Sequence, residues 1–177
     1  EQAQRIFGLG VEKIAVSSLA VEAPSMISEI AERVGNQSVV VVMDVKKKVF
    51  GNKYELYIHN GKKGTGINPI EFAAKMEQLG AGEIVINSID HDGMMKGYDL
   101  NLIRKIREVI SIPLTVLGGA GTIDDIGSII KENGIIGVAA GSLFVFKGKY
   151  KAVLINYPTI AEKEFLIQKY FLPFWNK

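Results

Sequence analysis

The sequence of 177 residues predicts an α/β fold in which parallel strands alternate with helices. The first observation is a run of five apolar residues, Val39 to Met43, that leads directly into Asp44. A continuous β-branched run without alternation is typical of a strand covered by helices on both faces. The second is the alternation of such strands with helical patterns, and the third is an internal repeat.

In the first part of the chain, glycines and a proline bound the predicted elements. We predict a helix over residues 1–9 that ends at Gly10, a strand over 13–18, and the strand that carries Asp44 over 38–46. Between these strands, Pro24 opens a helix over Ser25–Val34, which Gly35 closes. These segments form a complete α-β-α step.

The second part of the chain repeats this step. Predicted helices cover residues 70–79, 100–110 and 122–130, and predicted strands cover residues 83–88, 113–117 and 136–140. Thr122 is expected to cap the last of these helices, because Asp125 lies three residues further on. Residues 46–66 predict a hairpin insertion, with three glycines near its end. An insertion at the carboxyl end of a parallel strand commonly acts as a lid.

The repeat relates two β-α units 124 residues apart. Residues 10–21 read GVEKIAVSSLAV and residues 134–145 read GIIGVAAGSLFV. Such two-fold similarity favours a closed (β/α)₈ TIM barrel over an open sheet. We therefore expect residues 1–177 to form one partial barrel, from the helix of unit three to unit eight, without the first three strands. About 80 preceding residues are then expected, since such domains have roughly 250 residues.

Composition excludes several classes of protein. The chain is 47% hydrophobic and 23% charged, which is ordinary for one globular domain. Lys+Arg exceed Asp+Glu by only two, without a basic face, so we expect no nucleic-acid partner. We also expect no membrane association, because no apolar run approaches the length of a membrane span. The absence of cysteine excludes disulfides and thiolate zinc sites, and is compatible with a cytoplasmic location.

Asp44 is the leading candidate for catalysis. It lies where a buried strand emerges, and the carboxyl ends of such strands are where barrels bind ligands. A carboxylate there is typical of a general acid or base. Asp90 and Asp92 could supply a second carboxylate, although organisation of their loop through Asx turns explains them equally well. The two histidines are far apart, so we expect neither a metal nor a cofactor.

Three glycine-containing loops follow strands on what should be one face. They contain Gly93, Gly118 to Gly121, and Gly141 with Ser142. Backbone N–H groups in such loops commonly bind phosphate, although each glycine alone could simply make a tight turn. Ser17 and Ser18, at the repeat-related position, could hold a second phosphate. A small substrate with a phosphate at each end is therefore predicted.

Five motifs together resemble a known family. They are residues 42–46 (VMDVK), 61–66 (GKKGTG), 80–84 (GAGEI), 88–93 (SIDHDG) with 97–99 (GYD), and 118–121 (GGAG). In this order, over about residues 1–157, they resemble the cyclase subunit of imidazole glycerol phosphate synthase from histidine biosynthesis.

The resemblance implies a lyase that receives ammonia from a glutaminase partner. It would add ammonia to a phosphoribulosyl-formimino aminoimidazole carboxamide ribotide, close the imidazole ring and release the ribotide, without a cofactor. Asp44 matches the family's second catalytic aspartate, a general acid, whereas the first would end a strand that this chain does not contain. The other matched positions are Asp92, Gly93, Gly118, Gly119, Gly141 and Ser142 around one phosphate, Ser17 and Ser18 around the other, Lys13 and Glu83 as ammonia-gate charges, and Glu12 as a glutaminase contact.

Three substrate-facing positions depart from the family pattern. Ser17 stands where asparagine is typical, Met94 where threonine is typical, and Leu117 where serine is typical. Losing a polar contact to a polar substrate costs about 1–3 kcal/mol. An alternative is therefore a paralogous subunit that provides ammonia for amidation of a sugar in surface-polysaccharide biosynthesis. A further alternative is a non-catalytic half-barrel scaffold that only binds a partner.

Overall fold

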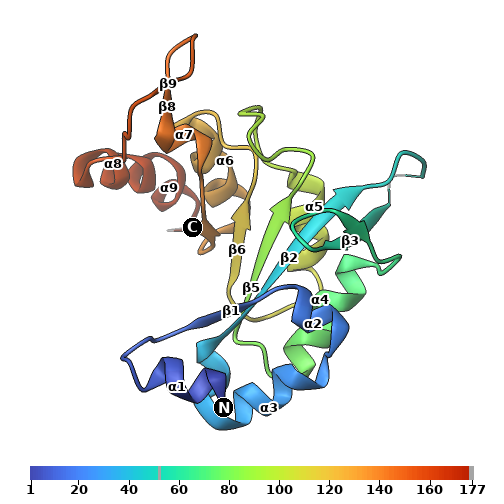
Figure 1. Ribbon diagram of the computed structural model, residues 1–177. Helices are drawn as coiled ribbons and strands as arrows, with labels where there is room; N and C mark the ends of the chain where they lie inside the picture. The colour runs from blue at the N-terminus through green and yellow to red at the C-terminus, as the bar shows by residue number, and fades with distance from the viewer. Residues whose placement is uncertain (52, 176–177) are drawn as a thin grey trace.

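Five parallel strands form the centre of the molecule (Figure 1). The structure is a computed structural model that describes residues 1–51 and 53–175, so Asn52, in the predicted hairpin turn, lies outside the described residues. The parallel strands are β1 Ile14–Val16, β2 Val39–Lys47, β5 Glu83–Ser88, β6 Leu114–Leu117 and β7 Gly137–Val138. They lie side by side in the order of the chain.

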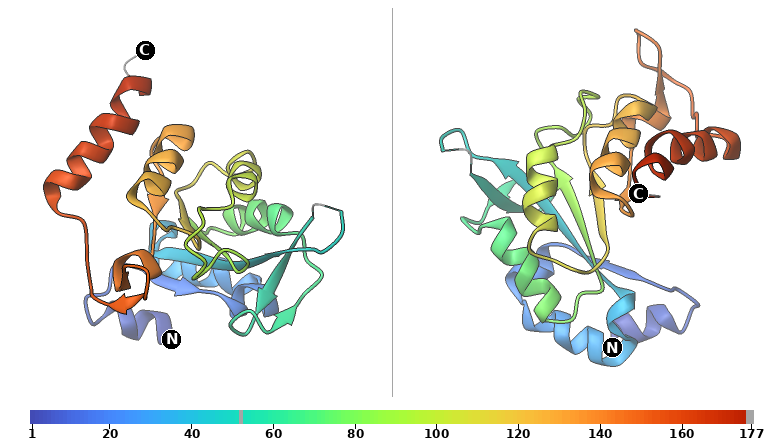
Figure 2. Two further views of the ribbon diagram at one scale, coloured as in Figure 1. Left: turned by 90° about the horizontal axis from the view of Figure 1, so that it is seen from above. Right: turned by 180° about the vertical axis from the view of Figure 1, so that it is seen from behind.

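The helices cover only one face of this sheet. Seen from behind, α4, α5 and α6 lie in front of the strands (Figure 2). On β5 the residues Ile84 and Ile86 are buried, whereas Val85 and Asn87 on the other face are only half-buried. Strand order that follows the chain, with helices on one side, is the arrangement of a barrel wall and not of a doubly wound sheet. The predicted (β/α)₈ fold class is therefore confirmed for the part of the barrel that this chain contains.

The helices predicted from the sequence are present, and some of the helices have side-chain caps. They are α1 Gln2–Phe7, α2 Ser18–Glu22, α3 Ser25–Val34, α4 Pro69–Gln78, α5 Leu100–Arg107, α6 Ile123–Asn133, α7 Ser142–Val145, α8 Ile160–Tyr170 and α9 Leu172–Trp175, with a 3₁₀ turn over Asn36–Ser38. Asn68 and Asp99 cap α4 and α5 through their side chains. Thr122 and Asp125 form the predicted capping box of α6.

The prediction of a strand through Ser18 is wrong by two residues. Strand β1 ends at Val16, Ser17 lies at the N-cap of α2, and Ser18 is the first residue of that helix. This five-residue helix is too short to show a helical period in the sequence. The serines therefore lie at a helix start and not on the end of a strand.

Strand β2 has two different partners along one edge. Its first residues pair in parallel with β1, whereas Asp44 to Lys47 pair antiparallel with β3, which spans Tyr54–Ile58. Strand β5 pairs with Val40 to Val45 on the opposite edge. A short strand, β4 Lys63–Gly64, completes the hairpin. The hairpin therefore continues the sheet beyond the point where β1 ends.

The core lies between the sheet and the helices. Both layers contribute side chains that are almost fully buried. They include Val39, Val41, Met43, Val45, Ile84, Ile86, Leu114 and Val116 from the sheet, and Ile27, Met76, Leu102, Ile106 and Ile129 from the helices. Each such side chain contributes about 1.5–3 kcal/mol through removal from water. This layer holds the strands in register.

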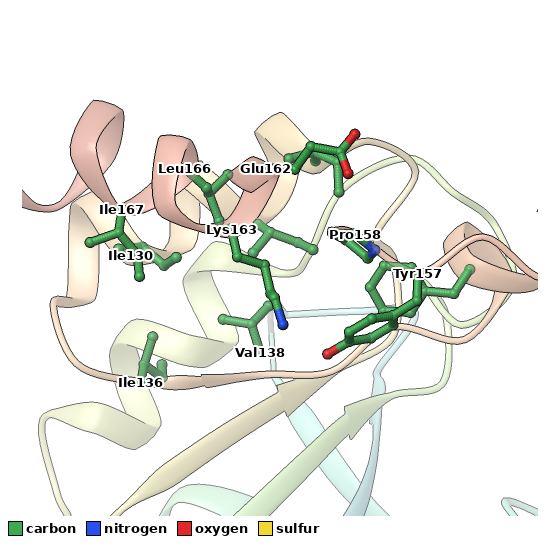
Figure 3. A pocket seen from close by; sticks show the side chains of 12 residues that line it. Ile130, Ile136, Val138, Tyr157, Pro158, Glu162, Lys163, Leu166 and Ile167 are labelled. Atoms are coloured by element: carbon green, nitrogen blue, oxygen red, sulfur yellow. The ribbon is translucent and has the colours of Figure 1, made fainter. Parts of the chain in front are cut away.

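The C-terminal part packs against α6. A hairpin of β8 Phe146–Lys147 and β9 Ala152–Val153 precedes α8. On α8, the Tyr170 hydroxyl donates to Asp124 at 2.6 Å and Lys169 pairs with the same carboxylate, which together hold the pKa of Asp124 below its ordinary value. Apolar residues of β7, α6 and α8 surround a cavity of about 240 Å³ (Figure 3). None of the described helices is long and apolar enough to span a bilayer.

Truncation of Ile84 tests the packing of the central strand. Ile84 is completely buried on β5, so Ile84→Ala is expected to lower the free energy of unfolding by about 3 kcal/mol, from lost burial and a cavity. Ile135→Ala is the matched control, because Ile135 is 80% exposed and its loss should cost less than about 0.5 kcal/mol. Urea unfolding of both variants measures the difference. Equal effects would contradict the assignment of Ile84 to the core.

Candidate functional site

Asp44 lies on the half-buried face of the sheet, at the carboxyl ends of the strands. It is in register with Asn87 on β5, which is in register with Leu117 on β6. Nδ2 of Asn87 donates a hydrogen bond of 2.9 Å to Oδ1 of Asp44. No ion pair of Asp44 occurs within the described ranges. The carboxylate is therefore held by one neutral donor.

Asp44 lines a pocket of about 320 Å³. The other lining residues are Asn60, Gly61, Asn87, Ile89 and Asp92. The pocket therefore brings together Asp44 and Asp92, two of the residues that the sequence singled out. A volume of this size is at the lower end of the range for small-molecule sites.

Asp90 and His91 have structural partners. Oδ2 of Asp90 accepts a hydrogen bond of 2.8 Å from the backbone N–H of Lys47, so Asp90 ties the loop after β5 to the end of β2. Nδ1 of His91 lies 2.8 Å from Oγ of Ser88, which is buried. Asp90 therefore organises its loop through this contact with β2, and not through the expected Asx turn.

The glycine loops after β5, β6 and β7 lie close together. A Cβ at Gly93 would lie 4.0 Å from Oγ of Ser142, and the N–H of Gly97 donates to the carbonyl of Gly119 at 2.9 Å. The Tyr98 hydroxyl donates to the carbonyl of Ala139 at 2.8 Å, which ties the same loop to the chain after β7. These contacts fix the three loops as one unit.

Some backbone donors in these loops are available and others are not. The N–H groups of Gly93, Gly119 and Ser142 donate no hydrogen bond to any residue that the structure describes. The N–H groups of Gly121 and Thr122, by contrast, both donate to the Asp125 carboxylate. Any anion site would therefore lie toward Gly93 and Ser142 and away from the start of α6.

Gly118 and Gly119 are required by their surroundings, whereas Gly141 is not. Both have positive φ, of 92° and 124°, and a Cβ at Gly118 would lie 2.7 Å from the Ser88 carbonyl oxygen. At Gly119 it would collide with the backbone of Gly97. A Cβ at Gly141 would meet nothing within 4 Å. Steric need explains the first two glycines, and close approach of a ligand would explain the third.

Ser17 and Ser18 do not line the Asp44 pocket. Oγ of Ser18 accepts a hydrogen bond of 3.0 Å from the backbone N–H of His59, which lies in the turn between β3 and β4. Nε2 of His59 also lies 3.2 Å from Oε1 of Glu22 on α2. Ser17 lines a separate cavity of about 640 Å³ beside α1, β1 and α3. Ser18 thus anchors the turn between β3 and β4 at His59. The residue after His59 in this turn, Asn60, lines the Asp44 pocket.

A second polar cluster occupies the amino ends of the strands. Nζ of Lys13 lies 2.6 Å from Oε2 of Glu83, and Thr115 donates to Oε1 of Glu83 at 2.8 Å. Burial alone would raise the pKa of Glu83, but these hydrogen bonds and the Lys13 charge outweigh it and lower the pKa. Glu12 is exposed beside Lys13. The predicted gate residues therefore meet at the end of the sheet opposite Asp44.

Residues 1–151 match the sequence profile of the histidine biosynthesis protein family. The chain belongs to this family. A relative from Vibrio vulnificus, provisionally named imidazole glycerol phosphate synthase subunit hisF3, is 55% identical over 93% of this chain and 63% of its own length. A relative from Leptospira interrogans, provisionally named imidazole glycerol phosphate synthase subunit HisF, is 56% identical over 94% of this chain and 65% of its own length.

More distant members of the histidine biosynthesis family match as well. The imidazole glycerol phosphate synthase subunit HisF of Alkaliphilus metalliredigens is 39% identical over 81% of this chain and 57% of its own length. The chain thus spans 63 to 65% of the length of the more similar curated relatives.

Sequence reasoning missed three residues of these clusters. Asn87 ends the apolar run of β5 just as Asp44 ends that of β2, and this similarity could have identified it. Thr115 alternates with apolar residues on β6, which placed it on the same face as Glu83. Asn60 carried no signal, because its place in the pocket depends on how the hairpin folds back.

Lys13→Met tests the cluster at the amino ends. A lowered pKa means that ionised Glu83 stabilises the fold above its ordinary pKa, and that this stabilisation disappears as the pH falls through the lowered value. Because Lys13 is half-exposed, we expect the variant to lose about 0.5–1 kcal/mol of unfolding free energy at neutral pH. The loss should shrink below about pH 4.

Denaturant unfolding over a range of pH measures this dependence. Lys75→Met, an exposed lysine on α4, is the control and should show no such pH-dependent difference. A Lys13→Met effect that is constant from acid to neutral pH would show that the ion pair does not stabilise the fold.

Proposed function

We propose that this chain provides the ammonia-dependent cyclase site of an imidazole glycerol phosphate synthase. The observation that carries the proposal is the pocket of about 320 Å³ at the carboxyl ends of the strands, where Asp44 and Asn87 are hydrogen-bonded. Barrel enzymes perform their chemistry at this end of the sheet. Membership of the histidine biosynthesis family and the names of the relatives support this choice of reaction.

In this reaction the enzyme is a lyase. Ammonia adds to a phosphoribulosyl-formimino aminoimidazole carboxamide ribotide, the imidazole ring closes to imidazole glycerol phosphate, and aminoimidazole carboxamide ribotide leaves. Asp44 acts as a general acid that donates a proton to the leaving nitrogen. Asp44 is half-buried and accepts one hydrogen bond, from the neutral amide of Asn87.

The substrate carries a phosphate at each end, and we assign one of them to the glycine loops. The N–H groups of Gly93, Gly119 and Ser142 lack acceptors among the described residues, and unpaired backbone donors of neighbouring loops can bind an anion. Gly118 shapes the same loop, Gly141 allows close approach, and Asp92 lines the pocket between this site and Asp44.

The second phosphate is assigned to Ser17 and Ser18. Ser18 is engaged by the hairpin turn through His59 and retains its own O–H donor, so phosphate binding there would add to that contact. The hairpin would then close over bound substrate.

Ammonia would arrive from a glutaminase partner in the cytoplasm. Lys13 and Glu83 stand at the opposite end of the sheet and would form the entrance, and exposed Glu12 beside them would contact the glutaminase. The alternative role of this cluster as a structural cap is compatible with the same contacts.

A second candidate is amidation of a sugar by the surface-polysaccharide paralogue. Leu117 supports it, because this apolar side chain stands in the same row as Asp44 and Asn87, where the family has a serine. An apolar group in this row suits a substrate with fewer polar groups at that point.

Asp44→Asn tests the cyclase proposal. With ammonium salt as the nitrogen source, the full-length protein should convert the ribotide precursor, and the variant should lose about 10²–10⁴-fold in rate, as expected when a general acid is removed. Release of aminoimidazole carboxamide ribotide measures turnover. Glu29→Gln, on the exposed surface of α3, should retain full activity.

The same assay separates the alternatives. If the full-length protein binds the precursor no better than inorganic phosphate, the cyclase proposal fails and sugar amidation takes its place. If it binds no phosphate but does bind a glutaminase, the scaffold alternative takes its place.

Ser142→Ala tests the phosphate site. Loss of a hydrogen bond to a charged ligand should weaken binding of inorganic phosphate about tenfold, measured by calorimetry. Ser128→Ala is the matched control, because Oγ of Ser128 only donates to the carbonyl of Asp124 on the surface of α6. Equal phosphate affinity in the two variants would exclude the Ser142 hydroxyl from the site, because the backbone N–H remains in Ser142→Ala.

A further inference from the structure

Asn87 has a buried acceptor without a donor. Its Nδ2 donates to Asp44, but its Oδ1 is buried and has no hydrogen-bond partner among residues 1–51 and 53–175. An unsatisfied buried acceptor is unfavourable, and most such groups in folded proteins are paired. Strand β5 is central, so solvent cannot satisfy this oxygen from a sheet edge. A polar side chain retained at such a cost calls for a functional explanation.

The oxygen of the Asn87 amide lies next to Gly118. Gly118 has no Cβ, and a Cβ there would lie 3.0 Å from Oδ1 of Asn87 and 2.7 Å from the carbonyl oxygen of Ser88. Oδ1 of Asn87 and the carbonyl oxygen of Ser88 therefore both lie next to Gly118. No described residue holds Oδ1 in its present position.

We propose that Asn87 is a positioning residue that holds Asp44 in both of its protonation states by rotation of its side-chain amide. An ionised Asp44 can only accept, and it accepts from Nδ2 as observed. A protonated Asp44 has an O–H to donate, and Oδ1 of Asn87 is the acceptor that becomes available after rotation. No proton passes to Asn87 in this rotation, and no bond to carbon is made or broken.

This inference rests on the proposed function, in which Asp44 must hold a proton and then donate it. A partner that can only donate would leave the O–H of a protonated Asp44 without an acceptor. Asn87 can serve either state, whereas a charged partner would favour only the ionised one. The amide therefore keeps the reacting oxygen in one place through the catalytic cycle.

Other charged groups around Asp44 are few. Asp92 is the second titratable residue that lines the pocket. Tyr57 is the partner of Asp44 on β3, and Nζ of Lys46 lies 5.7 Å from the centroid of the Tyr57 ring. None of these groups is hydrogen-bonded to Asp44 in the described structure, so Asn87 is the group that orients it.

Two substitutions of Asn87 separate positioning from packing. Asn87→Leu removes both hydrogen-bonding functions and should lower kcat of the cyclase reaction about tenfold. KM should stay nearly constant, because the hydrogen bond of Asn87 goes to Asp44 and not to the N–H groups assigned to the phosphate. Asn87→Asp keeps the size and can accept from protonated Asp44, but when ionised it cannot donate. Its activity should persist only toward acid pH, where the two carboxyl groups share a proton.

The control is Asn133→Leu, which removes another asparagine whose Nδ2 makes a single hydrogen bond, to the carbonyl of Ile129 on α6. It should leave both kcat and the pH profile unchanged. A merely structural role for Asn87 would not lower kcat in Asn87→Leu while KM stays constant. An unchanged kcat in Asn87→Leu, or an unchanged pH profile in Asn87→Asp, would overturn the proposal.

A measurement without turnover distinguishes failure of this inference from failure of the proposed function. In ¹⁵N-labelled full-length protein, the side-chain amide signals of Asn87, assigned by their loss in Asn87→Leu, should shift as the pH is lowered. The shift should be absent in Asp44→Asn. If wild-type protein shows the shift but no turnover, the cyclase function fails and the positioning role stands. Signals that do not respond to pH, or that respond equally in Asp44→Asn, would overturn the positioning role.

Discussion

The ladder between β2 and β5 is the constraint on which the rest of the structure depends. Six residues of each strand pair in parallel, and the helices bury Val41, Met43 and Val45 on one face. Because side chains alternate along a strand, burial of these three residues forces Asp44 onto the other face. A slip of one residue would place the carboxylate in the core and the apolar side chains in the pocket. Packing energy therefore determines where the candidate acid stands.

The two ends of the open face differ in how well their polar groups are satisfied. At the amino ends, Glu83 has partners for both of its oxygens, in Lys13 and Thr115. At the carboxyl ends, Asp44 has one neutral donor, Asn87 has an unsatisfied oxygen, and neighbouring loops carry unused N–H groups. Fully paired groups stabilise a fold, whereas groups that lack partners are the ones left to bind a ligand. This asymmetry is a physical reason to place substrate chemistry at the carboxyl ends.

The hairpin connects this chemistry to the rest of the fold. Strand β3 of this hairpin pairs with β2 past the end of β1. The turn between β3 and β4 contacts Ser18 on α2, and its residues Asn60 and Gly61 line the pocket. The pocket wall therefore combines segments that are remote in the sequence. A change in how the turn sits on α2 would alter the opening of the pocket directly.

The sequence by itself determined the features that depend on local patterns. Uninterrupted apolar strands, glycine stops and the Thr122 capping box predicted the order of helices and strands, and the position of Asp44 after an apolar run predicted its emergence at the carboxyl ends. The chemistry of glycine likewise predicted the loops at Gly93 and Gly119. These inferences succeed because periodicity, capping and turn preferences act over a few residues.

Only the tertiary structure decided how the side chains pair across the sheet. The bond from Asn87 to Asp44, the capture of Asp90 by the backbone of Lys47, and the contact of Ser18 with the hairpin each join residues more than 40 positions apart. Such pairings follow from strand register and from the way the hairpin folds back, which the packing of the whole core sets. A local pattern carries no information on that register, so these contacts required the folded chain.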